Sequence, residues 1–329
     1  MSDRDPPFVS IVIPVKNGAG RLECCLDSLA RQRYPRESVE VIVVDGRSTD
    51  ATRAVAESRG ARVVDNPREL VAAGRNVGFR HARGEIVAFT DDDCTFPEDW
   101  LERATIHFQD PCVAGLGGPT RMPADESHFG KAVSFLFEIG VRAASSVHAE
   151  KVEVKRIVSD LPGCNMFYRH SALEQVMPVI ETLVTAEDVE LGFRLRKAGF
   201  RLFTVPDVSV LHHKRPTPRR FFRQMYRFAI GRLQVGRRHV GALRPAHVVA
   251  GMAIPASVLL LPLALIGLPV LALSLFVMAL AQTGAAAVAI RVPVVVIGGV
   301  FAWSAGFMRE LLCPLPTDEH QFDWSGHAG

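Results

Sequence analysis

The sequence predicts an α/β fold, a parallel, doubly wound sheet with helices on both faces in a three-layer domain, followed by an apolar C-terminal region. Three observations lead to this prediction. Short apolar runs alternate with helix-like segments over residues 8–90, which is typical of parallel sheets with right-handed crossovers. An acidic triplet directly follows the last of these runs. From Val248 to Phe307 the only charged residue is Arg291.

The individual elements follow from periodicity and from turn residues. Apolar runs predict strands at 8–14, 39–44, 61–64 and 85–90, and a three-to-four-residue spacing predicts helices at 18–32, 51–57 and 70–81. Further along the chain we expect a strand at the sheet edge near 112–118 and a helix at 129–141, lying over the site or near a bilayer. A strand should follow the loop that starts at Leu161, and another should span 208–211.

The acidic triplet is the first candidate site. Asp91, Asp92 and Asp93 come directly after the apolar run 86–89, and the carboxyl ends of parallel strands are where open α/β sheets bind ligands. Three adjacent carboxylates repel one another, and hard ions such as Mg²⁺ or Mn²⁺ take oxygen ligands together with phosphates. The triplet therefore predicts a divalent-cation site. The alternative is a solvated acidic loop that caps the helix after Pro97.

The first strand is not followed by a glycine-rich phosphate loop. The segment after it reads Pro14-Val15-Lys16-Asn17-Gly18, with neither Gly-x-Gly-x-x-Gly nor Gly-Lys-Ser/Thr. This removes the main support for a dehydrogenase or a P-loop enzyme. If a nucleotide binds, a metal ion must carry most of its diphosphate charge.

Four motifs in order resemble glycosyltransferase family 2, whose members have the GT-A nucleotide-sugar fold. They are the segments 12–17, 43–50, 74–78 and 82–93. The resemblance implies that Asp45 contacts the nucleotide base, with Pro14 and Arg75 in the same pocket. It implies that Asp91 and Asp93 form the D-x-D metal and diphosphate site, and it places Val15, Asn17 and Asp92 among the nucleotide-binding residues. Alternatively, Asp45 caps a helix and Arg75 forms a surface ion pair.

The same resemblance extends to the acceptor side. Residues 161–169 resemble the family's acceptor loop, which contributes Gly163 and Asn165, and residues 185–194 resemble its E-D motif at the start of a helix. This implies that Glu187 lies on the acceptor side and that Asp188 is the base that takes a proton from the acceptor hydroxyl. The two acids could instead favour a helix N-terminus. His213 or His212 is a candidate third metal ligand, and a structural histidine is the alternative.

Charge is segregated along the C-terminal third. Residues 214–244 contain ten Lys or Arg and no Asp or Glu. Such a run suits nucleic acid or an anionic membrane, and the apolar region that follows favours the membrane and excludes nucleic acid as the expected partner. Arginines and phenylalanines intermix between 219 and 235, which predicts a helix in the headgroup plane. Within it, Gln224, Arg227 and Phe228 resemble the family's Q-x-x-R-W element, with Phe in place of Trp.

Three apolar segments are candidate membrane spans: 246–266, 268–290 and 292–307. The third is short and could be re-entrant, so we expect two to three membrane helices. The predicted organisation is a catalytic domain at 1–213, a basic interfacial segment at 214–245, a membrane region at 246–312 and a tail at 313–329. The N-terminus does not resemble a secretory signal, so we expect a multi-pass protein of the cell membrane with a cytosolic catalytic domain. Six cysteines without C-x-x-C spacing are expected to be free thiols.

These features predict an inverting, Mn²⁺- or Mg²⁺-dependent glycosyltransferase that moves a sugar from a nucleotide-diphospho-sugar to a hydroxyl of a lipid-linked or membrane glycan. Two alternatives stay open. A polyprenyl-phosphate sugar synthase would use a phosphate acceptor that needs no base. A membrane scaffold with a non-catalytic domain would need none of the acidic residues.

Overall fold

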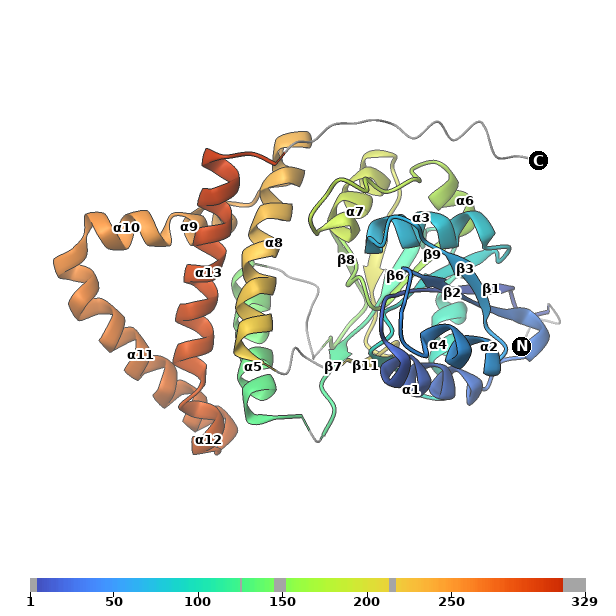
Figure 1. Ribbon diagram of the computed structural model, residues 1–329, viewed down its shortest axis with the longest axis horizontal. Helices are drawn as coiled ribbons and strands as arrows, with labels where there is room; N and C mark the ends of the chain where they lie inside the picture. The colour runs from blue at the N-terminus through green and yellow to red at the C-terminus, as the bar shows by residue number, and fades with distance from the viewer. Residues whose placement is uncertain (1–4, 125, 145–151, 213–216, 316–329) are drawn as a thin grey trace.

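The computed structural model describes residues 5–124, 126–144, 152–212 and 217–315. An α/β domain and a group of long helices lie side by side (Figure 1). The strands are β1 (Val9–Val15), β2 (Val39–Asp45), β3 (Arg62–Asp65), β4 (Ile86–Phe89), β5 (Cys94–Thr95), β6 (Gly115–Gly117), β7 (Thr120–Arg121), β8 (Arg156–Val158), β9 (Met166–Arg169), β10 (Leu202–Thr204) and β11 (Val210–His212). The helices are α1 (Ala19–Ala30), α2 (Thr52–Ser58), α3 (Val71–His81), α4 (Trp100–His107), α5 (His128–Ala144), α6 (His170–Glu174), α7 (Glu187–Lys197), α8 (Pro218–Arg238), α9 (Pro245–Gly251), α10 (Ala253–Leu259), α11 (Leu261–Thr283), α12 (Ala286–Ala289) and α13 (Val292–Leu312).

The main sheet is mixed rather than parallel throughout. Its order is β3-β2-β1-β4-β9-β6-β10-β8, and the first four strands are parallel as the strand–helix alternation predicts. β9 runs antiparallel to both β4 and β6, and β8 runs antiparallel to β10. The expected edge strand near 112–118 is β6, which lies inside the sheet. The expectation failed because the alternation ends after α4, and β9 reaches its place only through pairing with distant residues.

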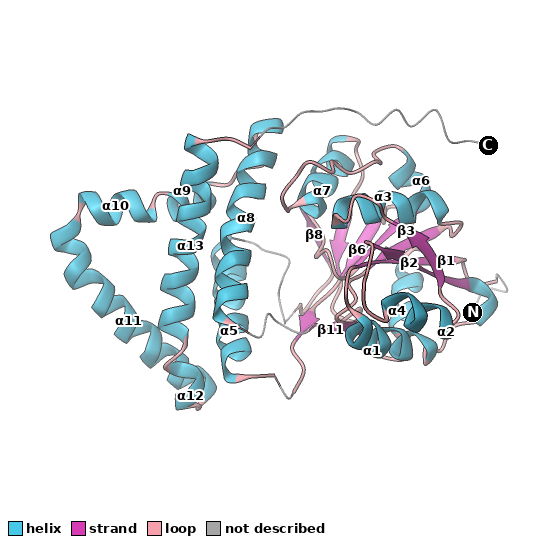
Figure 2. Ribbon diagram, in the orientation of Figure 1, coloured by secondary structure: helices cyan, strands magenta, loops and turns pink. Residues whose placement is uncertain are grey.

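Helices cover both faces of this sheet (Figure 2). Side chains of β1 alternate between the two layers: Ile11 and Ile13 pack towards α1, α2 and α4, whereas Val12 packs towards α3, α6 and α7. A three-layer α/β domain is therefore confirmed. A second sheet, β5-β11-β7, lies beyond the carboxyl end of β4, and it carries residues of the site described below.

α8 is enclosed by protein on two sides. One face, with Phe221 and Met225, packs on α5 and α13, and these three helices stand side by side in Figure 1. The opposite face contacts the α/β domain, where Val235 packs on Leu183. The sequence predicts an amphipathic helix here, and the helix is present. Its aromatic face, however, is buried against other helices instead of being free for lipid.

Of the two to three expected membrane helices, the described part of the chain has two that are long and apolar enough to cross a membrane: Leu261–Thr283 and Ala286–Leu312. The first expected span, 246–266, is divided into α9, α10 and the start of α11. One of its breaks has a clear cause: Pro262 has no N–H to donate and its ring clashes with the carbonyl four residues earlier, so it is best tolerated in the first turn of α11, which starts at Leu261. Hydropathy alone does not reveal such a break.

α11 exposes an almost wholly apolar surface. Of its 23 residues only Leu275 and Ala279 are buried. Leu263, Leu265 and Ile266 are each about two thirds exposed (67%, 68% and 69%). Soluble proteins rarely expose contiguous apolar patches of this kind.

A buried ion pair joins α8 to α13. Glu310 is completely buried, and its Oε1 lies 3.1 Å from Nη1 of Arg237, which also donates to the Glu310 carbonyl oxygen at 2.8 Å. We expect Arg237→Met to lower the free energy of unfolding by about 3 kcal/mol, because it removes one of the two arginines, Arg237 and Arg309, that pair with this buried carboxylate. Thermal unfolding in detergent measures the loss. The double variant Arg237→Met/Glu310→Leu should recover most of it, and equal losses in both variants would contradict the explanation.

Candidate active site

The loops after β1, β2 and β4 meet at one edge of the sheet because the three strands are parallel neighbours. Val15 pairs with Asp45 in register, and the Gly46 amide donates to the Val15 carbonyl at 2.8 Å. Asn17 has a positive φ of 50°, which asparagine tolerates better than most residues. Its Oδ1 accepts from the Thr49 amide at 2.8 Å, so the first two loops are fastened together.

Asp45 is almost fully buried and contacts residues of its own loop. It accepts from the Ser48 amide at 3.2 Å, and Nη1 of Arg53 lies 3.3 Å from its Oδ2. The sequence places Arg75 in the same pocket, but the cation beside Asp45 is Arg53, from α2. Pro14 faces α3, since a Cβ added at Gly74 would lie 2.8 Å from the Pro14 Cβ.

The three aspartates point to three different cationic partners. Oδ1 of Asp91 lies 3.8 Å from Nη2 of Arg75, and Oδ2 of Asp92 lies 2.7 Å from Nη2 of Arg21. Asp93 faces His212, with Oδ1 3.1 Å from Nε2. The protein itself therefore offsets part of the repulsion within the triplet. Asp92 is turned towards α1, so only Asp91 and Asp93 remain for a shared ligand. His213 lies outside the described residues.

Arg75 connects the acidic triplet to the start of α7. Its guanidinium is buried, with only 4% of the side chain exposed, and it donates to Glu187 through Nη1 and to the Gly163 carbonyl through Nη2 at 3.1 Å. Asp91 lies beside the same Nη2. No local pattern in the sequence indicates this contact, because Arg75 and Glu187 are 112 residues apart and meet only in the folded chain. Arg75 is thus the common partner of the D-x-D and E-D motifs.

Asp188 lies at the N-terminus of α7, close to Gly163. A Cβ added at Gly163 would lie 3.2 Å from Asp188 Oδ2, and the Asp188 Oδ1 accepts from the Val189 amide at 2.8 Å. Burial, followed by the neighbouring Glu187 charge, raises the pKa of Asp188 to about 6. Burial likewise raises the pKa of Asp91 to about 7. Two carboxyls with raised pKa values on either side of Arg75 are typical of a catalytic site.

Asn165 does not reach this site. Its side chain is completely buried, accepts from Nε1 of Trp100 at 3.1 Å and donates to the Val208 carbonyl at 2.8 Å. These bonds hold the amide inside the core, whereas the family resemblance implies a place on the acceptor side. Gly163 and Glu187 lie at the site as expected.

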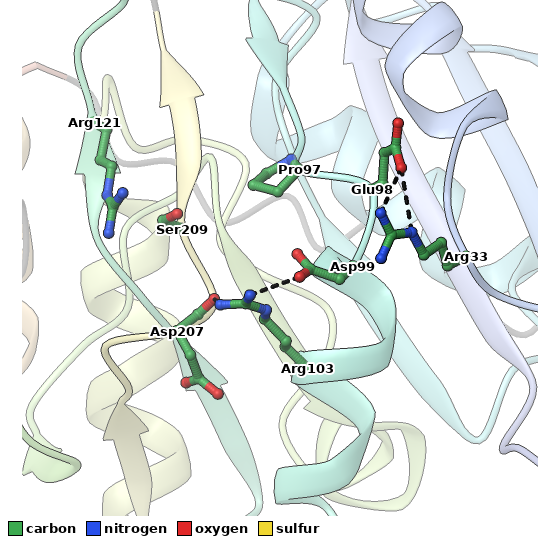
Figure 3. Close-up of a pocket in the computed structure, with 8 residues that line it drawn as sticks. All are labelled: Arg33, Pro97, Glu98, Asp99, Arg103, Arg121, Asp207 and Ser209. Carbon is green, nitrogen blue, oxygen red and sulfur yellow. Dashed lines mark hydrogen bonds and ion pairs between the residues drawn. The ribbon is translucent and has the colours of Figure 1, made fainter.

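One hollow within the described ranges lies elsewhere, beside β5 and β11. It has a volume of about 360 Å³ and is lined by Arg33, Pro97, Glu98, Asp99, Arg103, Arg121, Asp207 and Ser209 (Figure 3). Arg103 lies across it and pairs with Asp99 at 2.6 Å, and Arg33 pairs with Glu98 at 3.0 Å. Its charges are largely paired with one another, and it contains none of the carboxylates described above.

The order of the strands and the acidic residues at the carboxyl end of β4 together define a glycosyltransferase domain of the GT-A fold. The family model described as Glycosyl transferase family 2 matches residues 10–177, and the chain belongs to that family.

Three comparisons show how far the similarity extends. Glycosyltransferase AglE of Haloferax volcanii is 29% identical over 239 residues, which cover 70% of this chain and 74% of that protein. The Methanococcus voltae dolichyl N-acetyl-alpha-D-glucosaminyl phosphate 3-beta-D-2,3-diacetamido-2,3-dideoxy-beta-D-glucuronosyltransferase is 23% identical and covers 66% and 70%. Among solved structures, the mannosyltransferase PcManGT from Pyrobaculum calidifontis, in complex with GDP-Man and Mn²⁺, is 25% identical, has a TM-score of 0.64 and covers 90% and 88%.

Proposed function

We propose that this glycosyltransferase moves a sugar, with inversion, from a nucleotide-diphospho-sugar to a hydroxyl group of a lipid-linked saccharide at a membrane surface. One observation carries the proposal: buried Arg75 joins Asp91, at the end of β4, to Glu187 beside Asp188. This arrangement sets a group suited to the donor diphosphate next to a carboxyl suited to remove a proton.

The donor side fits a divalent cation. Asp91 and Asp93 offer hard oxygen ligands. Burial raises the pKa of Asp91, which means that its negative charge is poorly stabilised, so a cation beside it would be favourable. These two residues would hold Mn²⁺ or Mg²⁺, which supplies neutralising charge to the diphosphate leaving group when bound. Asp45, Pro14, Val15 and Asn17 would form the nucleotide side. GDP-Man and Mn²⁺ in the similar mannosyltransferase structure support this assignment.

On the acceptor side, Asp188 would take the hydroxyl proton as the oxygen attacks the anomeric carbon. With a pKa of about 6 it is mostly ionised at pH 7, and it is still a stronger base than an ordinary aspartate. Arg75 holds Glu187 and the Gly163 carbonyl, which orients the start of α7. A phosphate acceptor would need no base, so this placement favours a hydroxyl acceptor over a polyprenyl-phosphate sugar synthase. Mass spectrometry of the product lipid separates the two.

The membrane part of the proposal rests on the two candidate spans, α11 and Ala286–Leu312. The exposed leucines of α11 would lie in lipid, and the basic residues of α8, including Arg223 and the Arg227 of the Q-x-x-R-F element, would lie on the cytosolic side. Arg227 also donates to the Val184 carbonyl at 3.3 Å, and Phe228 packs among the helices, so neither side chain is left wholly to lipid. The relative named for a dolichyl-linked phosphate sugar supports a lipid-linked acceptor.

Donor binding tests the proposal, and the triplet provides its own control. In calorimetry on the full chain in detergent, Asp91→Asn should weaken Mn²⁺-dependent nucleotide-sugar binding at least about tenfold, because it removes a ligand charge. Asp92→Asn should leave binding nearly unchanged, since that side chain points to Arg21. Failure of the wild-type protein to bind any nucleotide-sugar with Mn²⁺ would overturn the proposed function.

A further inference from the structure

Four parts of the chain meet beside the proposed base: the segment after β8, α7, the C-terminal half of α8 and the start of α9. A Cβ added at Gly192 of α7 would lie 2.8 Å from the Ser159 carbonyl oxygen and 3.2 Å from the Asp160 Cβ. Asp188 lies one turn before Gly192, and hence on the same face of α7. The segment after β8 therefore packs on the face of α7 that carries the base.

Two arginines contact this segment. Nη1 of Arg232, from α8, lies 3.6 Å from Oδ2 of Asp160. Nη2 of Arg244, which precedes α9, donates to Ser159 Oγ at 2.7 Å. The Ser159 hydroxyl in turn donates to Asp160 Oδ1 at 3.2 Å. Asp160 is buried, whereas 21% of the Arg232 side chain is exposed, so a guanidinium group beside the base stays accessible.

Arg232 keeps N–H groups for a further ligand. In the described part of the chain its one charged partner is Asp160, and their 3.6 Å separation is longer than an ordinary hydrogen bond. Arg232 also lies close enough to act on the proposed base. Burial and the Glu187 charge raise the pKa of Asp188, and the Arg232 charge opposes that rise.

His247, in α9, adds a neutral donor to the two arginines. Its Nδ1 accepts from the Arg244 amide at 3.2 Å, which leaves the proton of the neutral ring on Nε2. Burial, followed by the charges of Arg232 and Arg244, lowers the pKa of His247 to about 4, so the ring is neutral at pH 7. Two guanidinium groups and an imidazole N–H form a set of donors suited to phosphate oxygens.

The place of this cluster in the chain indicates which phosphate it binds. On one side is Asp188, and on the other α9 leads into α10, where Val258 and Leu259 are 71% and 83% exposed. A lipid-linked saccharide has the same order of chemistry: a sugar hydroxyl, then a phosphate or diphosphate, then a hydrocarbon chain. We propose that Arg232, Arg244 and His247 bind the phosphate or diphosphate that links the acceptor saccharide to its lipid, an inference that rests on the proposed function.

Metal-free binding of farnesyl diphosphate tests the site. The full chain in an uncharged detergent with EDTA is titrated with farnesyl diphosphate in a calorimeter, and with farnesol for comparison. EDTA removes the cation that the donor site would need to hold a diphosphate. We expect the wild-type protein to bind farnesyl diphosphate at least about tenfold more tightly than farnesol, and Arg232→Gln to lose at least about tenfold in that affinity. Equal affinities for the two ligands, or an unchanged affinity in Arg232→Gln, would overturn the proposal.

Arg223→Gln is the matched control. Arg223 is exposed and lies on the opposite side of α8 from Arg232, so its variant removes the same charge from the same helix. It should keep the wild-type affinity for farnesyl diphosphate. Equal losses in the two variants would mean that the basic surface attracts anions in general, and the assignment would fail. If thermal unfolding shows that Arg232→Gln does not fold, Arg244→Gln gives the same test.

A second arm separates the acceptor's phosphate from the headgroups of the surrounding lipid. The titration is repeated in mixed micelles that contain phosphatidylglycerol at the concentration of farnesyl diphosphate. The affinity should change little, and displacement of farnesyl diphosphate by phosphatidylglycerol would show a general headgroup site instead. Because no nucleotide-sugar is present, these outcomes do not depend on donor binding, and their failure would leave the proposed transfer standing.

Discussion

Asp188→Asn is expected to lower kcat by about a thousandfold while leaving Mn²⁺-dependent donor binding close to that of the wild-type protein. The amide has the shape of the carboxylate but cannot accept the acceptor's proton. The carboxyl is held between Gly163 and the start of α7, so little rearrangement should follow. Transfer to a lipid-linked acceptor gives kcat, and calorimetry gives the donor affinity. Unchanged kcat in this variant would remove Asp188 from the mechanism.

The pH dependence of the transfer activity tests the proposed role of Asp188 independently. A general base works only when it is deprotonated, and burial raises the Asp188 pKa to about 6. Activity of the wild-type enzyme should therefore fall as pH drops through about 6 and level off above it. Asp188→Asn should lack this acidic limb in its residual activity. Asp207→Asn, which alters a carboxylate hydrogen bonded to His107 and distant from Arg75, should keep the wild-type profile.

Local signals account for what the sequence predicted well. The first four strands and three helices carry their own periodicity and turn residues, so the parallel half of the sheet was predictable. β9 was not, because its antiparallel pairing with β4 joins residues about eighty positions apart. The contacts of Arg75 could not be predicted for the same reason, because its partners Gly163 and Glu187 lie 88 and 112 positions away along the chain. Motifs named the acidic groups, but only the fold shows that one arginine joins them.

The helical part shows another limit of sequence reasoning. An amphipathic pattern identifies a helix with an apolar face but does not say whether lipid or protein covers it. In α8 that face packs on α5 and α13, and its other side contacts the loop before α7. Gln224, Arg227 and Phe228, which resemble a family element, lie in α8. The close approach of α8 to the segment before α7 occurs at Gly231, which no motif indicated.

Gly231 lets α8 approach the segment that leads into α7, the helix that carries the proposed base, Asp188. A Cβ at this position would lie 2.3 Å from Thr185 Oγ1 and 2.4 Å from the Thr185 carbonyl oxygen. Thr185 in turn donates to the Arg227 carbonyl at 3.1 Å, and buried Gln234 accepts from the Val184 amide at 3.1 Å. Three residues after Thr185 comes Asp188. The position of the proposed base is thus tied to the helix that packs against α13.

We therefore expect Gly231→Ala to lower kcat by about a hundredfold, the effect of displacing a catalytic group by roughly 1 Å, while donor affinity changes little. The added methyl must push the Thr185 backbone away, since a carbonyl oxygen cannot rotate aside as a side chain can. Gly84→Ala is the matched control: it places a Cβ 2.5 Å from the Ser10 amide nitrogen and 2.7 Å from the Phe8 carbonyl oxygen, at the edge of the sheet opposite the acidic triplet. Both variants should lower thermal stability, because each forces packed backbone apart. Only Gly231→Ala should lose more activity than its stability loss explains, and equal losses of kcat in both would mean that α8 supports the fold without positioning Asp188.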